Sequence, residues 1–404
     1  MTNELKKVPE LRFPEFDGEW ENSKLGTVAN VYDGTHQTPK YTSEGIKFLS
    51  VENIKTLNSN KFISKEAFEK EFKIRPEFGD VLMTRIGDVG TPNVVETNEH
   101  LAYYVSLALL KPKKLNSYFL ESLIRSQTVQ NELWRKTLHI AFPKKINKNE
   151  IAKVEINYPE QMEQQKIGEF FSKLDRQIEL EEQKLEKLKE QKNGYMQKIF
   201  SQQLRFKDEN GNDYPEWKLC KLKDITISLK GQEKITKNLP ILTISASKGW
   251  LKQEERFSQI IAGNSLKKYT HIKKGDLSYN KGNSKLAKYG IVYMLKEGEA
   301  LVPNVYKSFR PKKYIASYFL EKYFHSQSVD RQLRTKISST ARMDGLLNIS
   351  DKDFYEVNLK IPSYSEQEKI GKFFEKYDKC IQKQSNKIEL LKKRKKSFLQ
   401  KMFV

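Results

Sequence analysis

Two stretches of the chain carry apolar residues in alternating steps of four and three, the spacing of a helix with one apolar stripe. The first stretch starts at Ile167 and the second at Ile370, and neither contains a proline. Each predicted helix covers about 40 residues and would measure roughly 60 Å. The residues predicted to form the helix interface are Ile167, Phe171, Leu174, Ile178, Leu185, Leu188, Ile370, Phe374, Ile381, Ile388 and Leu391.

Each of these helices needs a partner, because a single one would leave its apolar stripe in water. The obvious partner is its own duplicate, and pairing with another molecule is the alternative. If the two helices run antiparallel, Lys192 falls near Tyr377 and Lys395 near Leu174. We expect the lysine stems to lie along these apolar groups and their ammonium groups to stay in water. Polar residues at such positions help to specify register.

The helices belong to a repeat that covers the chain. "EQQKIGEFFSKLD" from Glu163 matches "EQEKIGKFFEKYD" from Glu366, and "SYFLE" occurs at Ser117 and again at Ser317. "LRFPEFDGEW" is answered by "LRFKDENGNDYPEW" in the same order. The sequence therefore encodes two copies of one plan, each about 200 residues long. The copies agree best in the helices and least before them, which favours a shared scaffold with two different recognition surfaces; plain tandem domains are the alternative.

The part before each long helix predicts a mixed α/β (α+β) domain. Short runs of β-branched and aromatic residues, such as "IKFLSVENI" and "YGIVYML", alternate with turn signals. One further helix is expected over residues 117–136 and its counterpart over 317–336, each followed by a polar, basic loop. The predicted division is 1–159 and 204–362 for two recognition domains, and 160–203 and 363–404 for two helical spacers.

The charge of the chain points to a polyanionic partner. Its 404 residues have a formal net charge of +21, so nucleic acid is the first candidate and an anionic membrane surface or ribosomal surroundings the alternative. Two cysteines and five scattered histidines give no disulfide framework and no metal-ligand spacing, so no metal is expected. The N-terminus has no apolar segment and no run is long enough to span a bilayer, so we expect a soluble, cytoplasmic protein without a membrane partner.

Catalytic motifs are missing from the sequence. It has no Walker-type GxxxxGK[ST] and no Asn-Pro-Pro-Tyr or Asp-Pro-Pro-Tyr tetrapeptide of the kind used by amino-methyltransferases. The chain is therefore expected to be a binding protein without catalytic residues.

Several loops carry side chains suited to DNA contacts, because Asn and Gln pair with adenine, Arg and Lys with guanine, and lysine with phosphate. Any one of these residues is about as well explained as an ordinary surface side chain. Arg85 could instead cap a strand, and Trp134 is better explained by partial core packing than by base stacking. The candidates are Thr35, His36, Gln37, Thr38, Lys40, Arg85, Arg135, Lys136, Lys144, Lys145, Tyr279, Asn280, Lys281, Asn283, Lys285, Arg334, Lys336 and Arg342.

The chain resembles the specificity subunit of type I restriction-modification systems. The features that carry the resemblance are "PELRFPEFDGEW", the duplicated "EQ-x-KIG-x-FF-x-K-x-D" blocks and the two "SYFLE" helices, and it covers essentially the whole chain. It implies two target recognition domains joined by two long helices in an antiparallel coiled coil, with an internal pseudo-twofold repeat. Each recognition domain would read one half of an asymmetric, bipartite site in double-stranded DNA.

The resemblance also implies partners. Two methyltransferase (modification) subunits and restriction subunits would dock on the helices and supply adenine methylation and ATP-driven cleavage. S-adenosylmethionine, ATP and Mg are then expected in those subunits, with no cofactor in this chain. The alternatives are a stand-alone sequence-specific DNA-binding regulator with internal pseudo-dimer symmetry, or a coiled-coil assembly protein whose charge is incidental.

Overall fold

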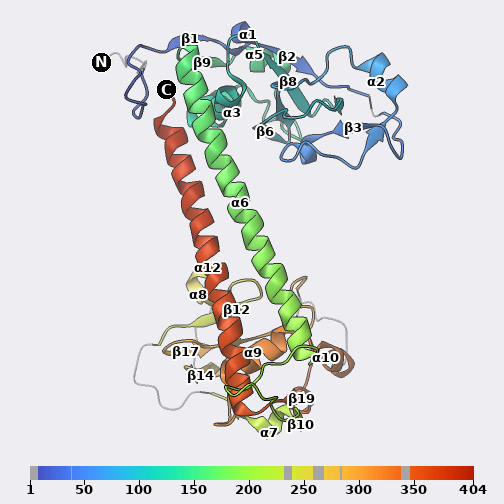
Figure 1. Ribbon diagram of the computed structural model, residues 1–404, viewed down its shortest axis with the longest axis vertical. Coiled ribbons are helices and arrows are strands. Elements are labelled where there is room, and N and C mark those ends of the chain that lie inside the picture. The colour runs from blue at the N-terminus through green and yellow to red at the C-terminus, as the bar shows by residue number, and fades with distance from the viewer. Residues whose placement is uncertain (1–7, 38, 232–238, 258–267, 283, 338–345) are drawn as a thin grey trace. The chain divides into compact units, whose positions relative to one another are not determined.

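The computed structural model describes residues 8–37, 39–231, 239–257, 268–282, 284–337 and 346–404. The chain forms two compact units, one of residues 1–183 with 386–404 and the other of residues 184–385. The boundaries between the units fall inside the two long helices, α6 (Gln161–Phe200) and α12 (Tyr364–Lys401). Each unit therefore contains part of both helices (Figure 1).

The first unit is built on an antiparallel sheet with the strand order β2-β8-β5-β6. A second sheet, β4-β3-β7, contains a parallel pair between β3 and β7, and β1 pairs with β9. The elements are β1 (Glu21–Lys24), α1 (Leu25–Val28), β2 (Ala29–Asp33), β3 (Ile46–Leu49), η1 (Val51–Asn53), β4 (Phe62–Ile63), α2 (Lys65–Glu71), β5 (Val81–Ile86), β6 (Asp88–Val94), β7 (Leu101–Tyr103), β8 (Leu107–Pro112), α3 (Ser117–Arg125), α4 (Gln127–Lys136), α5 (Lys148–Ala152) and β9 (Glu155–Tyr158).

The second unit repeats this plan around the sheet β11-β18-β15-β16 and the pair β10-β19. It differs beside this sheet, where the described residues form two separate strand pairs, β12-β13 and β14-β17, in place of one three-stranded sheet. The elements are β10 (Lys218–Lys221), α7 (Leu222–Ile225), β11 (Thr226–Leu229), β12 (Leu242–Ser245), β13 (Gly249–Lys252), α8 (Gln253–Phe257), β14 (Thr270–Lys273), β15 (Leu277–Asn280), β16 (Ile291–Met294), β17 (Glu299–Val302), β18 (Lys307–Pro311), α9 (Ser317–His325), α10 (Asp330–Lys336), α11 (Asp351–Tyr355) and β19 (Asn358–Ile361).

The helix expected over residues 117–136 is broken in two, so this expectation is wrong in detail. Ser126 has an extended backbone (φ −64°, ψ 151°), which ends α3, and its hydroxyl accepts a hydrogen bond from the Val129 amide at the start of α4. A serine that caps a new helix satisfies an otherwise unpaired amide and favours the break. Its counterpart is also split, into α9 and α10.

The predicted antiparallel pairing of the long helices is confirmed within each unit. In the first unit the start of α6 packs on the end of α12, with the Phe170 and Phe398 ring centroids 5.1 Å apart. In the second unit the end of α6 packs on the start of α12, with Tyr195 and Phe373 at 5.2 Å. Among the eleven interface positions, Leu174, Leu185, Leu188 and Ile381 are half-buried, whereas Ile167, Phe171, Ile178, Ile370, Phe374, Ile388 and Leu391 are buried.

The hydrophobic core of each unit includes an aromatic residue from the C-terminal end of a long helix: the end of α12 in the first unit and the end of α6 in the second. Phe403, just after α12, lies in the first unit among Trp20, Phe119 and Phe171, with ring centroids 5.7 to 6.1 Å away. Phe200, at the end of α6, fills the matching place in the second unit beside Phe319. The duplicated helices therefore belong to the packing of both units.

The duplicated glutamate and glutamine anchor the start of each long helix. Glu163 is fully buried and accepts two hydrogen bonds from Arg12, at 2.8 and 2.7 Å. Gln164 accepts the Asn116 amide at 2.9 Å and donates to the Pro159 carbonyl at 2.8 Å.

The second copy repeats this arrangement. Arg205 binds Glu366 in the same two-bonded way, and Gln367 accepts the Ala316 amide and donates to the Pro362 carbonyl. In each copy, the arginine of the "LRF" motif and the glutamate of the "EQ" motif therefore form the same ion pair.

Candidate nucleic-acid interface

Three of the sequence-predicted DNA contacts of the first unit, Arg85, Lys144 and Lys145, lie where β5 ends. Beyond α4 the chain returns to this strand, with the Ile146 amide donating to the Arg85 carbonyl at 3.0 Å and the Gly87 amide to the Lys144 carbonyl at 2.7 Å. The second unit has the same connection, since the Leu347 amide donates to the Lys281 carbonyl at 2.8 Å. Both units therefore bring a strand end and the segment after α4 or α10 together.

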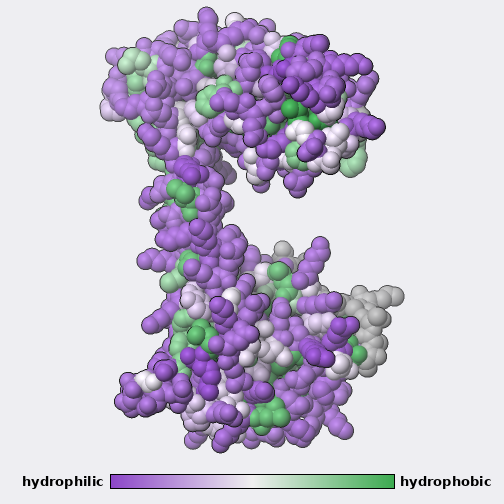
Figure 2. Space-filling model, turned by 45° about the vertical axis from the view of Figure 1, so that its right-hand side comes forward, coloured by the Kyte–Doolittle hydropathy of each residue, from purple (hydrophilic) through white to green (hydrophobic). Residues whose placement is uncertain are grey.

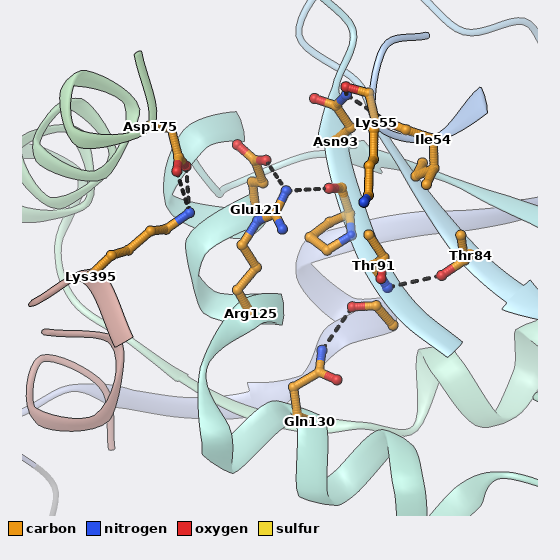
Figure 3. Close-up of polar contacts among 12 residues, drawn as sticks. Ile54, Lys55, Thr84, Thr91, Asn93, Glu121, Arg125, Gln130, Asp175 and Lys395 are labelled. Atoms are coloured by element: carbon orange, nitrogen blue, oxygen red, sulfur yellow. Dashed lines mark hydrogen bonds and ion pairs between the residues drawn. The ribbon is translucent and has the colours of Figure 1, made fainter. Parts of the chain in front are cut away.

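Helices α3 and α4 hold the neighbouring strand β6 in place (Figure 3). Arg125 donates to the Pro92 carbonyl at 2.6 Å and to Glu121 at 2.8 Å. Gln130 donates to the Gly90 carbonyl at 2.7 Å, and Asn93 ties the same strand to the Ile54 carbonyl. Hydrogen bonds from α3, from α4 and to the Ile54 carbonyl therefore fix the position of β6 beside β5.

Arg85 is buried, which does not fit the expected DNA contact. Its Nε donates to the Ile146 carbonyl at 2.9 Å and its Nη1 pairs with Asp33. Only 6% of its side chain is exposed, so the guanidinium already has partners inside the protein. Arg85 instead joins β2 to β5 and to the segment after α4.

The other candidates of the first unit that the structure describes are exposed or partly exposed. His36, Gln37 and Lys40 are exposed, and the Thr35 hydroxyl accepts a hydrogen bond from the Gln37 amide. Arg135 is exposed and pairs with Glu132 at 2.7 Å. Lys136 lies 3.7 Å from the same carboxylate, whereas Lys144 and Lys145 are exposed.

Two candidates of the second unit have structural partners. Tyr279 is buried, its ring is 4.6 Å from that of Phe354, and its hydroxyl donates to the Tyr289 carbonyl at 2.6 Å. Asn280 uses both ends of its amide, donating to the Ile244 carbonyl and accepting the Gly282 amide. Neither arrangement fits a base contact.

The remaining candidates of the second unit divide into surface residues and residues outside the described part. Lys285 and Arg334 are exposed, and Lys281 and Lys336 are partly exposed. Asn283 and Arg342 lie outside the described residues, as does Thr38 of the first unit.

A basic cavity of about 390 Å³ in the second unit was missed by sequence reasoning. Lys230, Lys268, Lys281 and Lys307 line it together with Asp351. Lys230 and Lys307 both pair with Asp351, at 2.8 and 2.5 Å, and their hydrogen bonds lower the pKa of this carboxyl to about 2. These residues are far apart in sequence, and no local motif links them.

One ion pair occupies corresponding places in the two units with its charges exchanged. In the first unit Asp33, at the end of β2, lies 3.9 Å from Lys148 at the start of α5. In the second unit Lys230 follows β11 and pairs with Asp351 at the start of α11. The scaffold is therefore shared, whereas the charge pattern on the corresponding surfaces differs.

Within the described residues, the His, Cys, Asp and Glu side chains do not gather into a group of three or more that could hold a metal ion. None of the helices in the described ranges is long and apolar enough to cross a membrane. The surface visible in Figure 2 is mostly hydrophilic on both units.

Comparison with known proteins defines the class. The chain matches the family described as the type I restriction modification DNA specificity domain twice, over residues 17–190 and 214–393. These matches cover most of the chain, and it belongs to this family with two copies of the domain. Its place in that family is that of a DNA sequence-specificity protein.

Solved structures share the fold over almost the full length. The crystal structure of a type I restriction-modification system S subunit from M. genitalium superposes with a TM-score of 0.63 at 14% identity, covering 98% of this chain and 99% of the other. A chain from a study of complex assembly and conformational transition of the type I R-M system gives a TM-score of 0.50 at 14% identity, with coverages of 94% and 96%. At this identity the likeness concerns the fold.

Proposed function

We propose that the two units read two different halves of one bipartite, asymmetric target in double-stranded DNA. The observation that carries this proposal is the reversed ion pair, Asp33–Lys148 in one unit and Lys230–Asp351 in the other. A duplicated scaffold that keeps its framework and exchanges surface charges is suited to two distinct base sequences. Net charge adds a general attraction for phosphate that weakens with salt.

The long helices are the proposed docking elements for the catalytic subunits. Two methyltransferase subunits and the restriction subunits would assemble on this chain, which itself would be non-catalytic and act in the cytoplasm. The duplication supports two equivalent docking places, because each unit carries the same helix-start anchor, Arg12–Glu163 or Arg205–Glu366. S-adenosylmethionine, ATP and Mg would then bind to the partner subunits. A solved structure with this fold comes from a type I R-M system studied for its complex assembly, which is consistent with this arrangement.

The proposal is tested by mapping methylated adenines in the genome of cells that express the chain with its modification subunits. A bipartite motif with two unlike halves is expected. Replacing residues 20–159 with those of a relative should change one half only, and a change in both halves contradicts the division of labour. Mass measurement of the purified complex should give two methyltransferase subunits per chain, and any other ratio contradicts the docking proposal.

The helices are also proposed to set the length of the unread spacer between the halves. Inserting two heptads at matched places in α6 and α12 should lengthen the spacer or abolish methylation. Unchanged spacing in an active complex would refute this role.

A further inference from the structure

A short loop of the first unit, residues 138–145, is fixed at both ends. The Leu138 amide donates to the Lys145 carbonyl at 2.8 Å, and both Leu138 and Ile86 form β-bridges with Lys145. The Gly87 amide holds the Lys144 carbonyl at 2.7 Å. The loop is therefore anchored on the end of β5.

Two large apolar side chains lie at the tip of this loop in full contact with solvent. The relative exposure of Ile140 is 103% and that of Phe142 is 102%, higher than for any other large apolar residue in the described part of the chain. Leu138 and Trp134 beside them are 47% and 56% exposed. Apolar side chains gathered at the surface commonly mark a binding site.

Trp134 packs against two residues of the loop. The His139 ring lies 4.1 Å from the indole, and its Nε2 is 2.9 Å from the Trp134 carbonyl oxygen. Lys144 Nζ lies 4.6 Å from the indole centroid, within cation–π range. The sequence-based expectation of partial core packing does not fit Trp134, which is 56% exposed and packs against the loop, and the apolar tip is formed by other residues.

The charges around the tip favour a polyanion over a protein surface. Lys144 and Lys145 are exposed within the loop itself, and Arg135 and Lys136 precede it. The neighbouring acidic residue, Glu132, is already shared between Arg135 and Lys136. Apolar groups flanked by lysines suit the base stack between two phosphate backbones.

We propose that the 138–145 loop is a wedge that inserts Ile140 and Phe142 between neighbouring base pairs of duplex DNA. This inference rests on the proposed function and deepens it, because it assigns a DNA-distorting element to the half-site read by the first unit. The inserted side chains unstack one step, while Lys145 contacts a backbone phosphate. Anchored loop ends reduce the ordering cost of binding.

The wedge also acts as an indirect reader of sequence. Pyrimidine–purine steps unstack most easily, so such a step is favoured where the tip enters. The corresponding segment of the second copy, residues 338–345, reads "SSTARMDG" and lies outside the described residues. The inference therefore concerns the first unit.

The test uses the complex of the full chain with its modification subunits and a duplex carrying the mapped target. A 2-aminopurine reporter replaces one base at a time in the first half-site, away from the methylated adenine, so that unstacking is separated from base flipping. Binding of the wild-type complex should raise the 2-aminopurine fluorescence at one base-pair step. I140S/F142S should abolish that rise and weaken specific binding on the order of tenfold or more, with the salt dependence unchanged.

Two control variants distinguish the parts of the proposal. F78S removes another exposed phenylalanine, which precedes the opposite end of β5, and should keep both the fluorescence and the affinity. K145A should keep the fluorescence rise and reduce the slope of log affinity against log salt by about one.

Each other result decides against the wedge. If I140S/F142S keeps the fluorescence and the affinity, the wedge is refuted while the proposed function stands. If the I140S/F142S chain fails to bind the modification subunits in the absence of DNA, the loop is a protein-docking element and not a DNA wedge. A thermal midpoint well below wild type would show that the two side chains pack within the protein. No specific binding by wild type would refute the proposed function together with the wedge.

Discussion

The ammonium group of Lys192 lies 2.7 Å from Oδ1 of Asp378, within the second unit. Asp378 also accepts Lys322 at 2.9 Å and the Tyr318 hydroxyl at 2.5 Å. Burial opposes ionisation of this carboxyl, but the charges of Lys322 and Lys192 and the hydrogen bonds hold its pKa below the usual value. The polar position in the heptad pattern is therefore one member of a charged cluster between the helix pair and α9.

Replacing Asp378 with asparagine should destabilise the second unit by about 3–5 kcal/mol. The substitution leaves Lys322, only 3% exposed, with Glu321 as its remaining carboxylate, and an under-compensated buried charge is costly. Urea unfolding of the full chain measures the loss.

The first unit provides the matched control. Asp175 occupies the corresponding place and pairs with Lys395, but its side chain is 41% exposed. D175N should therefore cost about 1 kcal/mol or less. Equal losses in D175N and D378N would contradict the importance of burial.

The heptad pattern predicted where these lysines lie but not what their ammonium groups do. Lys192 was expected near Tyr377, and it does reach this part of α12. Its head group was expected in water, which is wrong, since it meets Asp378 one residue further along. A stripe of apolar positions specifies which faces meet, whereas ion pairs depend on residues beside the stripe and on a third element, here α9.

Lowering the pH from 6.5 to 4 should destabilise the second unit through His325. Burial and the nearby charge of Lys322 lower the pKa of this imidazole to about 4; Glu321 and Lys192 also act on it, and Tyr293 packs against its ring. The unfolded chain takes up a proton near pH 6.5, whereas the folded chain stays neutral until about pH 4. Because the unfolded state binds more protons in this range, the free energy of unfolding falls as the pH falls.

The comparison with H325Q isolates this effect. Glutamine can still donate to the Val292 carbonyl, which His325 Nε2 reaches at 2.7 Å, but it does not titrate. Asp330, whose pKa burial raises to about 6, acts in the opposite direction in both proteins. The thermal midpoints of the wild-type chain and of H325Q, measured from pH 7.5 to 4, should converge at low pH. Parallel curves of midpoint against pH would contradict the role of the imidazole.

The two glycines of the repeated "KIG" motif should respond oppositely to alanine. A Cβ on Gly168 would lie 2.7 Å from Asn116 Oδ1 and 2.8 Å from the Phe119 amide nitrogen, so it would disturb the cap of α3. On Gly371 the nearest atom, the Phe319 amide nitrogen, is 3.6 Å away, an ordinary contact. We expect G168A to lower stability by about 1–3 kcal/mol and G371A to raise it by up to about 1 kcal/mol.

Chemical denaturation of the two single variants checks this difference. A loss in both would mean that the helix start is equally tight in the two units. A gain in both would mean that α3 can move away from α6 at little cost.

Sequence reasoning reached the scaffold more fully than the recognition surface. Duplicated motifs and heptads carry local signals, so the two copies and the helix pairing were predictable. Arg85 looked like a surface cation, because nothing nearby in sequence reveals Asp33 as its partner. The opposed pair Lys230–Asp351 joins residues from the two ends of a domain, and such contacts arise only when the sheet brings them together.

Removing the charge of Arg12 should loosen the N-terminal segment and destabilise the first unit by about 3–5 kcal/mol. Glu163 is fully buried, and its carboxylate is held by the Arg12 guanidinium, whose pKa is raised by the hydrogen bonds between them. R12Q leaves the buried Glu163 carboxylate without its partner. R12Q/E163Q removes both charges and should recover part of the lost unfolding free energy. Limited proteolysis near Phe13, with urea unfolding in parallel, measures both effects. R205Q should act alike on the second unit through Glu366, because the same two-bonded contact is present there. If R12Q and the double variant are equally unstable, the cost lies in lost packing of the arginine stem and not in the stranded carboxylate.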